Sequence, residues 1–196
     1  MKYSIIILFL SVCLCTNAVS QKKNETNSWM KFHGLKSAEF VQLGEPGKLN
    51  MNKSPYNISN LETFRKFLMF SPDSARFIDL DSYSLALETD SAGKYYSYGS
   101  DIDSKVQLIS LSDSSSITIL FCGTLCYPEA ALWTSKNEFE IYGFHVLNTR
   151  KYIPTIWKVN TELNTMTYLQ YKSYLELEPK NYVQQVRLKE INFISR

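Results

Sequence analysis

The chain is poor in the side chains that perform most enzyme chemistry. Its 196 residues include two histidines, His33 and His145, and four cysteines. A Ser–His–Asp triad needs one of those histidines as its base, and no Gly-x-Ser-x-Gly elbow is present to hold a nucleophile. The sequence therefore nominates no catalytic residue. No second cluster of Cys and His completes a four-ligand metal set, so we expect neither a metal nor another cofactor.

An excess of charge of either sign is also missing. The formal net charge is +2, and the charged residues form no basic stripe and no acidic tail. This balance gives no electrostatic reason to expect a nucleic acid or an anionic membrane as a partner. Hydrophobic residues make up 44% of the chain, which is typical of a globular protein and argues against disorder.

Long apolar runs are absent except at the N-terminus. The run from Ser4 to Leu14 is shorter than the ~20 residues that a membrane-spanning helix needs. Two small residues, Ala18 and Ser20, then take the cleavage-site positions before Gln21. This order is typical of a secretory signal peptide. We therefore expect residues 1–20 to be removed, and the mature chain to be periplasmic or secreted without a transmembrane span.

A second interpretation of the same segment is a lipoprotein anchor. The sequence Leu10-Ser11-Val12-Cys13 resembles the lipobox of bacterial lipoproteins, although Val12 stands where that motif has a small residue. Lipidation at Cys13 would tether the protein to a membrane. The polar residues 21–28 are expected to form a flexible lead-in to a single domain, residues 29–196.

The expected mature chain retains two cysteines, Cys122 and Cys126. An exported protein meets an oxidising compartment, where paired thiols tend to be joined. A disulfide requires Cα atoms ~4.4–6.8 Å apart, so the segment between the cysteines would have to turn. Gly123 and Pro128 allow such a turn. The spacing fits either a local disulfide or two buried thiols.

Short runs rich in β-branched and aromatic residues fill the chain after residue 70, and turns rich in Ser, Asp and Gly divide them. Several runs alternate apolar and polar residues, as a strand with one solvated face requires. The predicted strands are 76–83, 105–111, 116–121, 138–142, 152–159 and 165–171.

Local signals refine this pattern at three places. Pro154 places its strand at a sheet edge or puts the proline near the start of the strand. Ser59 and Glu62 form a capping-box pattern, which predicts one short helix that ends before Pro72. The segment 182–193 fits either a strand or a short helix.

Two stretches of the chain repeat one rhythm of strands. The first begins at Ser71-Pro72-Asp73 and the second at Trp133, and each continues as further strands with a tight turn before the last. Over about residues 70–172 the chain thus resembles the blade repeats of TolB-like periplasmic β-propellers, whose motif is Ser-Pro-Asp-Gly. Ser74 replaces the glycine here.

A closed propeller takes typically 4–8 blades, so two units cannot close a ring. We therefore expect a mainly β fold of antiparallel meanders. In it, two blade-like four-stranded units pack as a sandwich, and one short N-terminal helix covers an edge or a face.

Two groups of residues are candidates for a site. Asp79 and Asp81 would share one face of a strand, where paired carboxylates serve acid–base chemistry or hold a cation. Asp101 and Asp103 repeat the pattern. The alternative is that these acids solvate a sheet face or form turns.

The second group is aromatic. Tyr83, Tyr95, Tyr96 and Tyr98 lie in an insertion between the first unit's strands. Tyrosines on a loop offer rigid contact area for a peptide or a sugar ring, although the same rings can pack on the sheet instead.

These features favour an exported, non-catalytic β domain that binds a protein or a glycan of the cell envelope. The expected contacts are the four tyrosines, with Asp79 and Asp81 as lower-ranked binding residues. The alternative is a hydrolase that uses the two aspartates on an envelope polysaccharide or ester.

Overall fold

The computed structural model describes residues 28–100, 103–148, 151–176 and 178–194. The predicted signal peptide, the lead-in up to residue 27, the lipidation alternative at Cys13 and the residue Asp101 lie outside the described residues. Among the described helices, none is long and apolar enough to cross a membrane.

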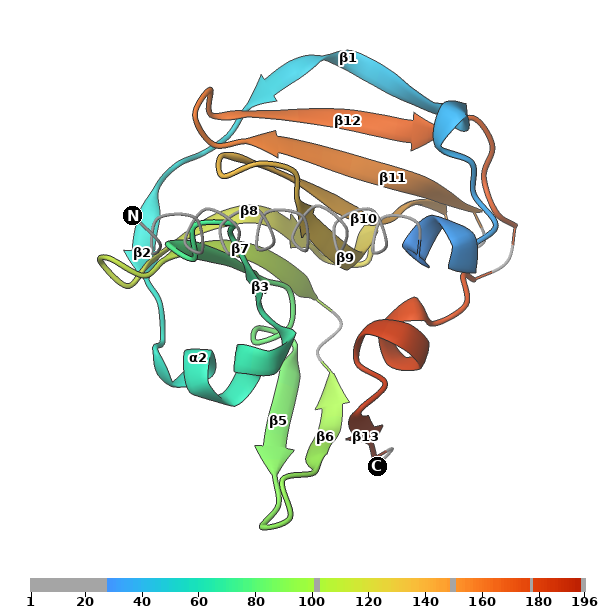
Figure 1. Cartoon of the computed structure of the whole chain (residues 1–196). Helices are drawn as coiled ribbons and strands as arrows, with labels where there is room; N and C mark the ends of the chain where they lie inside the picture. The colour runs from blue at the N-terminus through green and yellow to red at the C-terminus, as the bar shows by residue number, and fades with distance from the viewer. Residues whose placement is uncertain (1–27, 101–102, 149–150, 177, 195–196) are drawn as a thin grey trace, which may run out of the picture.

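Two five-stranded antiparallel sheets stack on each other (Figure 1). Sheet A contains, in spatial order, β1 (Phe40–Lys48), β12 (Thr165–Tyr171), β11 (Lys151–Asn160), β10 (Glu138–Asn148) and β9 (Cys126–Trp133). Sheet B contains β2 (Lys53–Pro55), β8 (Ser115–Cys122), β7 (Ser104–Ser110), β4 (Arg76–Asp79) and β3 (Met69–Phe70). The predicted mainly β, antiparallel and sandwich-like architecture is confirmed.

A smaller, third sheet is built from the insertion and the C-terminus. It contains β5 (Leu85–Thr89), β6 (Tyr95–Ser100) and β13 (Ile191–Phe193), with β13 parallel to β6. The β5–β6 hairpin projects away from the two large sheets (Figure 1). The C-terminal segment that fitted either a strand or a helix contains both, because the π-helical turn η3 (Val183–Arg187) precedes β13.

Each large sheet is a four-stranded meander with one added strand. The meanders are β9 to β12 in sheet A, and β3, β4, β7 and β8 in sheet B. The fifth strand comes from the N-terminal region in both cases, and pairs with the last strand of its meander. Neither added strand was predicted from the sequence, and β1 contains Gly44 and Pro46, two residue types that are uncommon inside strands. In the structure, β1 continues through them with a break in register between Leu43 and Gly47.

The two sheets share details of their final turns. Asn164 precedes β12 and Ser114 precedes β8, and both have positive φ, 54° and 50°. In sheet A the amide of Leu49 donates to the carbonyl of Asn164 at 2.9 Å. In sheet B the amide of Tyr56 donates to the carbonyl of Ser114 at 3.0 Å. The added strands therefore end on equivalent hydrogen bonds.

The sheets present opposite faces to their common core. Asn160 of β11 and Ser110 of β7 are equivalent, since each pairs with the first residue of the strand that follows. Val159 and Ile109, which precede them, are therefore equivalent too. Val159 lies in the core between the sheets, whereas Ile109 lies in the cluster on the far side of sheet B. Sheet A therefore contributes to the shared core the face whose equivalent in sheet B points outward.

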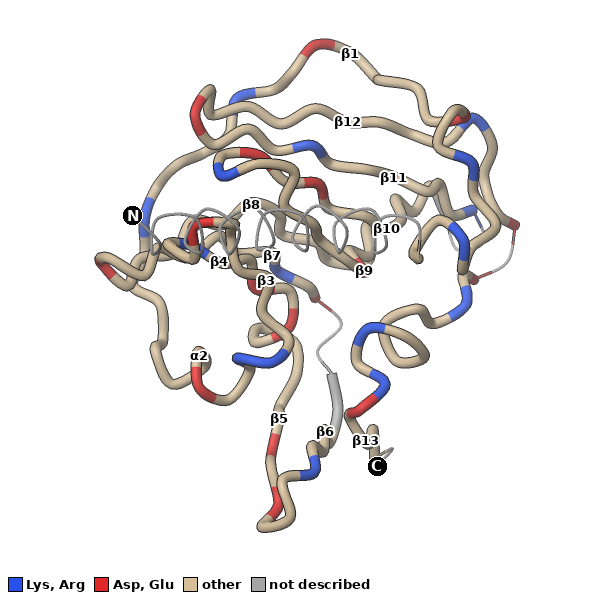
Figure 2. The backbone as a smooth tube through the Cα atoms, viewed as in Figure 1, with Lys and Arg blue, Asp and Glu red and all other residues tan. Residues whose placement is uncertain are grey.

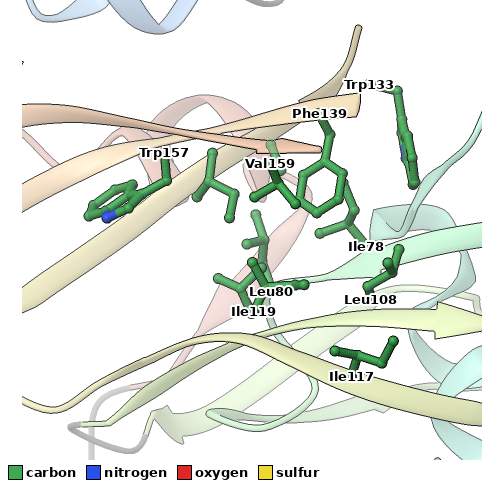
Figure 3. Close-up of a cluster of buried hydrophobic side chains, with 12 residues drawn as sticks. Ile78, Leu80, Leu108, Ile117, Ile119, Trp133, Phe139, Trp157 and Val159 are labelled. Atoms are coloured by element: carbon green, nitrogen blue, oxygen red, sulfur yellow. The ribbon is translucent and has the colours of Figure 1, made fainter. Parts of the chain in front are cut away.

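The shared core holds large aliphatic and aromatic side chains from both sheets, and each such side chain contributes about 1.5–3 kcal/mol when fully buried. Figure 3 labels Ile78, Leu80, Leu108, Ile117 and Ile119 on the sheet B side, and Trp133, Phe139, Trp157 and Val159 on the sheet A side.

Helical segments cover the two outer faces. A helical turn over residues 28–32 places Trp29 against sheet A, where it packs on Tyr142 and Phe144. The helix α2 (Ser59–Phe64) and the 3₁₀ turn η2 (Arg65–Phe67) cover sheet B. A further 3₁₀ turn, η1 (Ser37–Glu39), leads into β1.

The predicted helix forms and ends before Pro72, but the capping box was wrong. Ile58 is the N-cap residue and makes no side-chain cap hydrogen bond. The Asn57 side chain takes the expected role instead, because its Oδ1 accepts from the amide of Ser59 at 3.2 Å and from its hydroxyl at 2.8 Å. An Asx turn of this kind competes with a capping box for the same backbone groups.

Two proline signals agree with the structure. Pro72 lies in the tight turn between β3 and β4, where the Ser71 hydroxyl donates to Asp73 at 2.6 Å and Ser74 has a φ of 55°. Pro154 lies early in β11, and β12 pairs with β11 only from Thr155 onward. At Pro154 the strand therefore has only β10 beside it among the described strands.

Candidate functional site

A pocket of about 370 Å³ opens at one end of the two-sheet stack. Its walls are the segment after β4, the start of β7, the first half of β9 and the turn η3. The pocket exists because the two sheets end differently there. β4 stops at Asp79, whereas β10 in the equivalent position of sheet A continues to Asn148. Sheet A therefore overhangs sheet B, and η3 lies under the overhang (Figure 1).

A buried ion pair forms one wall. Arg187 of η3 makes a two-pronged contact with Asp81, with N–O distances of 2.6 and 2.7 Å. Burial alone would lower the pKa of Arg187, but the charge of Asp81 and the hydrogen bonds to it outweigh burial and raise that pKa. Removing one partner of such a pair costs about 3–5 kcal/mol, because the other charge stays buried and unpaired. This pair therefore holds η3 to the segment after β4.

Glu129 of β9 forms a second wall and binds segments from both ends of the chain. Its carboxylate Oε2 accepts a hydrogen bond from Trp29 Nε1 at 2.8 Å and is paired with His33 Nε2 at 2.8 Å. Its backbone carbonyl accepts from Arg187 Nε at 2.7 Å. Glu129 is only 7% exposed, so these partners compensate for the burial of its charge.

The third wall carries polar groups without partners. The hydroxyl of Ser104 is buried and makes no hydrogen bond within the described part of the chain. Asp103 and Glu178 also line the pocket, and neither carboxylate has an ion pair or hydrogen bond among the described residues. Asp103 lies beside the disulfide loop, since a Cβ added to Gly123 would be 3.4 Å from its Oδ1.

Cys122 and Cys126 form the local disulfide, with Cα atoms 5.3 Å apart. It joins the end of β8 to the start of β9, and Cys122 pairs with Ser104 across the sheet. Of the two arrangements that the spacing allowed, the disulfide is the one that forms. The disulfide therefore closes the loop that connects sheet B to sheet A.

Two tyrosines line the pocket, and exposed hydrophobic side chains lie near the disulfide. Tyr127 and Tyr152 both line the pocket, and their ring centroids are 6.5 Å apart. Phe121 and Leu125, next to the disulfide cysteines, are 57% and 65% exposed. Tyr83 packs edge-on against Phe121 with centroids 5.8 Å apart. The pocket lining thus combines carboxylates with aromatic rings.

The two predicted aspartates have different surroundings. Asp79 accepts hydrogen bonds from the Tyr56 hydroxyl at 2.7 Å, from the Ser82 hydroxyl and from two backbone amides. It is not among the residues that line the pocket, whereas Asp81 is. The strand ends at Asp79, so the alternation that would have placed both carboxylates on one face does not continue to Asp81.

The four predicted tyrosines lie in separate surroundings. Tyr83 is at the disulfide end, under Lys105. Tyr95 packs on Phe67 of η2, while the hydroxyl of Tyr96 donates to Asp90 at 3.2 Å within the hairpin. Tyr98 is 37% exposed. Tyr96 and Tyr98, two apart on β6, share one face of the strand.

Sequence reasoning missed most of the pocket. It did not nominate Glu129, Arg187, Ser104 or the pair formed by Tyr127 and Tyr152. One signal was available for Glu129, because it is a lone charge at the start of the otherwise apolar run Ala130 to Trp133. Nothing local marks Arg187, since its partners lie about a hundred and about sixty residues away.

Comparisons of the chain with protein-family models, with curated proteins and with solved structures return no match.

Proposed function

We propose that this chain is an exported, non-catalytic domain that binds a segment of another cell-envelope protein in the pocket beside the disulfide. The pocket and the tyrosines in its lining carry the proposal, since Tyr127 is 42% exposed there. The buried Ser104 hydroxyl, which makes no hydrogen bond within the described residues, also belongs to a lining residue, and a buried polar group without a partner costs about 1–3 kcal/mol.

Exposed hydrophobic side chains near the disulfide favour a protein over a glycan. Phe121, Leu125 and Tyr83 are such side chains, and they lie outside the pocket lining. Protein interfaces combine such anchors with a polar surround, and aromatic residues are enriched among them. The disulfide supports export, because disulfides persist in oxidising compartments.

The hydrolase alternative finds less support in the surroundings of its two acids. Asp79 is engaged by four donors, and Asp81 is held by both prongs of Arg187. A general acid or base must exchange a proton with a substrate, and a carboxylate with all its acceptor sites occupied is poorly placed for that. Retained turnover of envelope polysaccharides or esters in D79N and D81N variants would end the alternative.

Site-directed photo-crosslinking tests the binding proposal. We would place p-benzoylphenylalanine at Gln184, on η3 at the pocket, or at Glu62, on the far helix α2, in protein produced in its own host. We expect one discrete protein adduct from position 184 and none from position 62. The adduct should disappear in Tyr127→Ala while the melting temperature stays within about 2 °C of the parent value. Equal capture at both positions, or none at 184, would overturn the proposal.

The same assay addresses the hairpin tyrosines. Tyr98 is the most exposed of the three on β6, so Tyr98→Ala should remove the adduct if the hairpin contributes to the interface. An undiminished adduct would confine the binding site to the pocket and the exposed side chains near the disulfide.

A further inference from the structure

The charges that line the pocket do not cancel. Asp81, Asp103, Glu129 and Glu178 contribute carboxylates, and Arg187 contributes the one guanidinium. Asp81 occupies both prongs of that guanidinium, and the Glu129 carboxylate points to Trp29 and His33. The remaining two acids are the half-buried Asp103 and the exposed Glu178, so the lining carries two carboxylates without a cationic partner among the described residues, in a molecule whose charges of both signs are interspersed (Figure 2).

The aromatic wall has the geometry that a cation needs. Tyr127 and Tyr152 stand side by side with their ring planes 37° apart. The carboxylate of Glu178 lies close enough to raise the pKa of Tyr152, after burial as the larger cause. A cation in this position meets both an aromatic face and carboxylates, which is favourable on electrostatic grounds. The chain uses the same contact elsewhere, because Lys151 lies 4.4 Å from the ring centre of Tyr174.

A neutral ligand fits this wall less well. A sugar would stack on the tyrosines and pair with Ser104, but its hydroxyls would leave two negative charges uncompensated. A guanidinium matches carboxylates through two parallel hydrogen bonds and also stacks on aromatic rings. The Arg187–Asp81 contact shows that this wall already accommodates one such pair. The pocket volume of about 370 Å³ lies near the lower end of ligand sites, in keeping with one side chain rather than a large cofactor.

We infer that the pocket takes the cationic side chain of an arginine on the partner protein, with Asp103 and Glu178 as its counter-charges and Tyr127 and Tyr152 as its aromatic wall. An apolar neighbour of that arginine packs on Leu125, an exposed side chain two residues before Tyr127. This inference rests on the proposed function and specifies the residue that the pocket recognises.

Matched peptides test the inference. The probes are acetyl-Arg-Leu-amide, its neutral isostere acetyl-citrulline-Leu-amide, and N-acetylchitotriose as the glycan. Binding to the purified, disulfide-bonded protein is followed by NMR shifts of the backbone amides of Ser104, Tyr127 and Gln184. We expect the arginine peptide to shift these amides in a saturable way. The citrulline peptide should bind about tenfold more weakly, because it lacks the charge.

Charge variants locate the contact. Asp103→Asn and Glu178→Gln should each weaken the arginine peptide about threefold to tenfold and leave the citrulline peptide unchanged. Glu88→Gln is the matched control, since Glu88 is an exposed acid on β5 that does not line the pocket. Raising the salt from about 50 to about 300 mM should weaken only the arginine peptide.

The outcomes separate the two proposals. Equal binding of the arginine and citrulline peptides, or no effect of either charge variant, overturns the cation inference. Shifts caused by N-acetylchitotriose alone would assign the pocket to a glycan and overturn both proposals. If no probe shifts these amides while the adduct at position 184 still forms, the proposed function stands and the arginine inference fails.

Discussion

Sheet A and sheet B follow one plan and differ where the pocket lies. Both are meanders completed by an N-terminal strand, and both end that strand on a turn residue with positive φ. They differ after β4. In sheet A the matching strand, β10, continues past Ile141 to Asn148, whereas β4 stops at Asp79 and a long insertion follows.

This difference shows that the strands that build the fold and the segments that build the pocket are largely separate parts of the chain. The repeated part of each sheet contributes the apolar side chains of the shared core. Much of the pocket wall comes from parts that have no counterpart in the other sheet: the insertion, the overhang of β9 and β10, and η3, with the start of β7 completing it. A departure from the repeat leaves backbone and side chains without their usual partners, and a site can form there.

The largest effect should come from breaking the overhang. Gly143 lies at a register break between β10 and β9, and an added Cβ would be 2.0 Å from the carbonyl oxygen of Tyr127. Because that atom belongs to the backbone, relief requires β9 to move. We expect Gly143→Ala to lower the free energy of unfolding by about 3 kcal/mol in urea. Gly47→Ala on β1 is the control, since its nearest atom is 3.9 Å away. Equal losses in the two variants would refute the close-approach argument.

A medium effect on stability is expected at Asp79, whose equivalent position in sheet A is the apolar Ile141. Asp79 acts through the tyrosine that is hydrogen-bonded to it. Burial raises the pKa of Tyr56, and the charge of Asp79 and the hydrogen bond to it raise it further. Up to about pH 10 the tyrosine is protonated in both the folded and the unfolded chain. Above that pH only the unfolded chain ionises it, so the folded state loses stability as the pH rises.

The expected slope from Tyr56 is about 1.4 kcal/mol per pH unit above pH 10. Urea unfolding of the parent protein and of Tyr56→Phe at several pH values between about 9 and 11.5 measures it. The burial of other tyrosines adds a slope to both proteins, so the difference between the two is the readout. Parallel curves would show that Tyr56 ionises equally in both states.

The smallest effect should come from the two equivalent turn residues. Ser114 and Asn164 both adopt positive φ, which glycine adopts without strain and asparagine tolerates better than serine. We expect Ser114→Gly to raise the free energy of unfolding by about 0.5–1 kcal/mol, and Asn164→Gly to change it by less than about 0.3 kcal/mol. Thermal unfolding of the two variants in parallel gives the comparison. A larger gain at Asn164 would contradict the equivalence of the turns.

The regular part of the fold was accessible from sequence because its pattern is local. The alternation from Thr165 to Tyr171 predicts β12 with the bounds that the structure has, and Ser71-Pro72-Asp73 marks a real turn. The strands β1 and β2 were missed because they lie at sheet edges and are almost wholly exposed, so no apolar alternation marks them. Their positions depend on pairing with strands sixty or more residues later.

The site was accessible only in part. Asp81, Asp103 and the disulfide cysteines carry local signals, and the sequence analysis named all of them. Arg187 and Ser104 carry none, since the role of each depends on neighbours brought in by the fold. The spacing of Asp79 and Asp81 suggested that both carboxylates share one face of a strand. Because β4 ends at Asp79, the alternation does not reach Asp81, and the two carboxylates have different surroundings.

The two sheets meet through unlike faces, and this has a consequence for how many sheets can stack. Two sheets that met through the same face would form a closed pair, whereas units that offer unlike faces form an open-ended series, as in solenoids and head-to-tail filaments. Here the series has two members, and the segment around Trp29 and the helix α2 occupy the faces on which further units would add. Because these two segments cover the outer faces, no further sheet can pack there, and the stack ends at two sheets among the described residues.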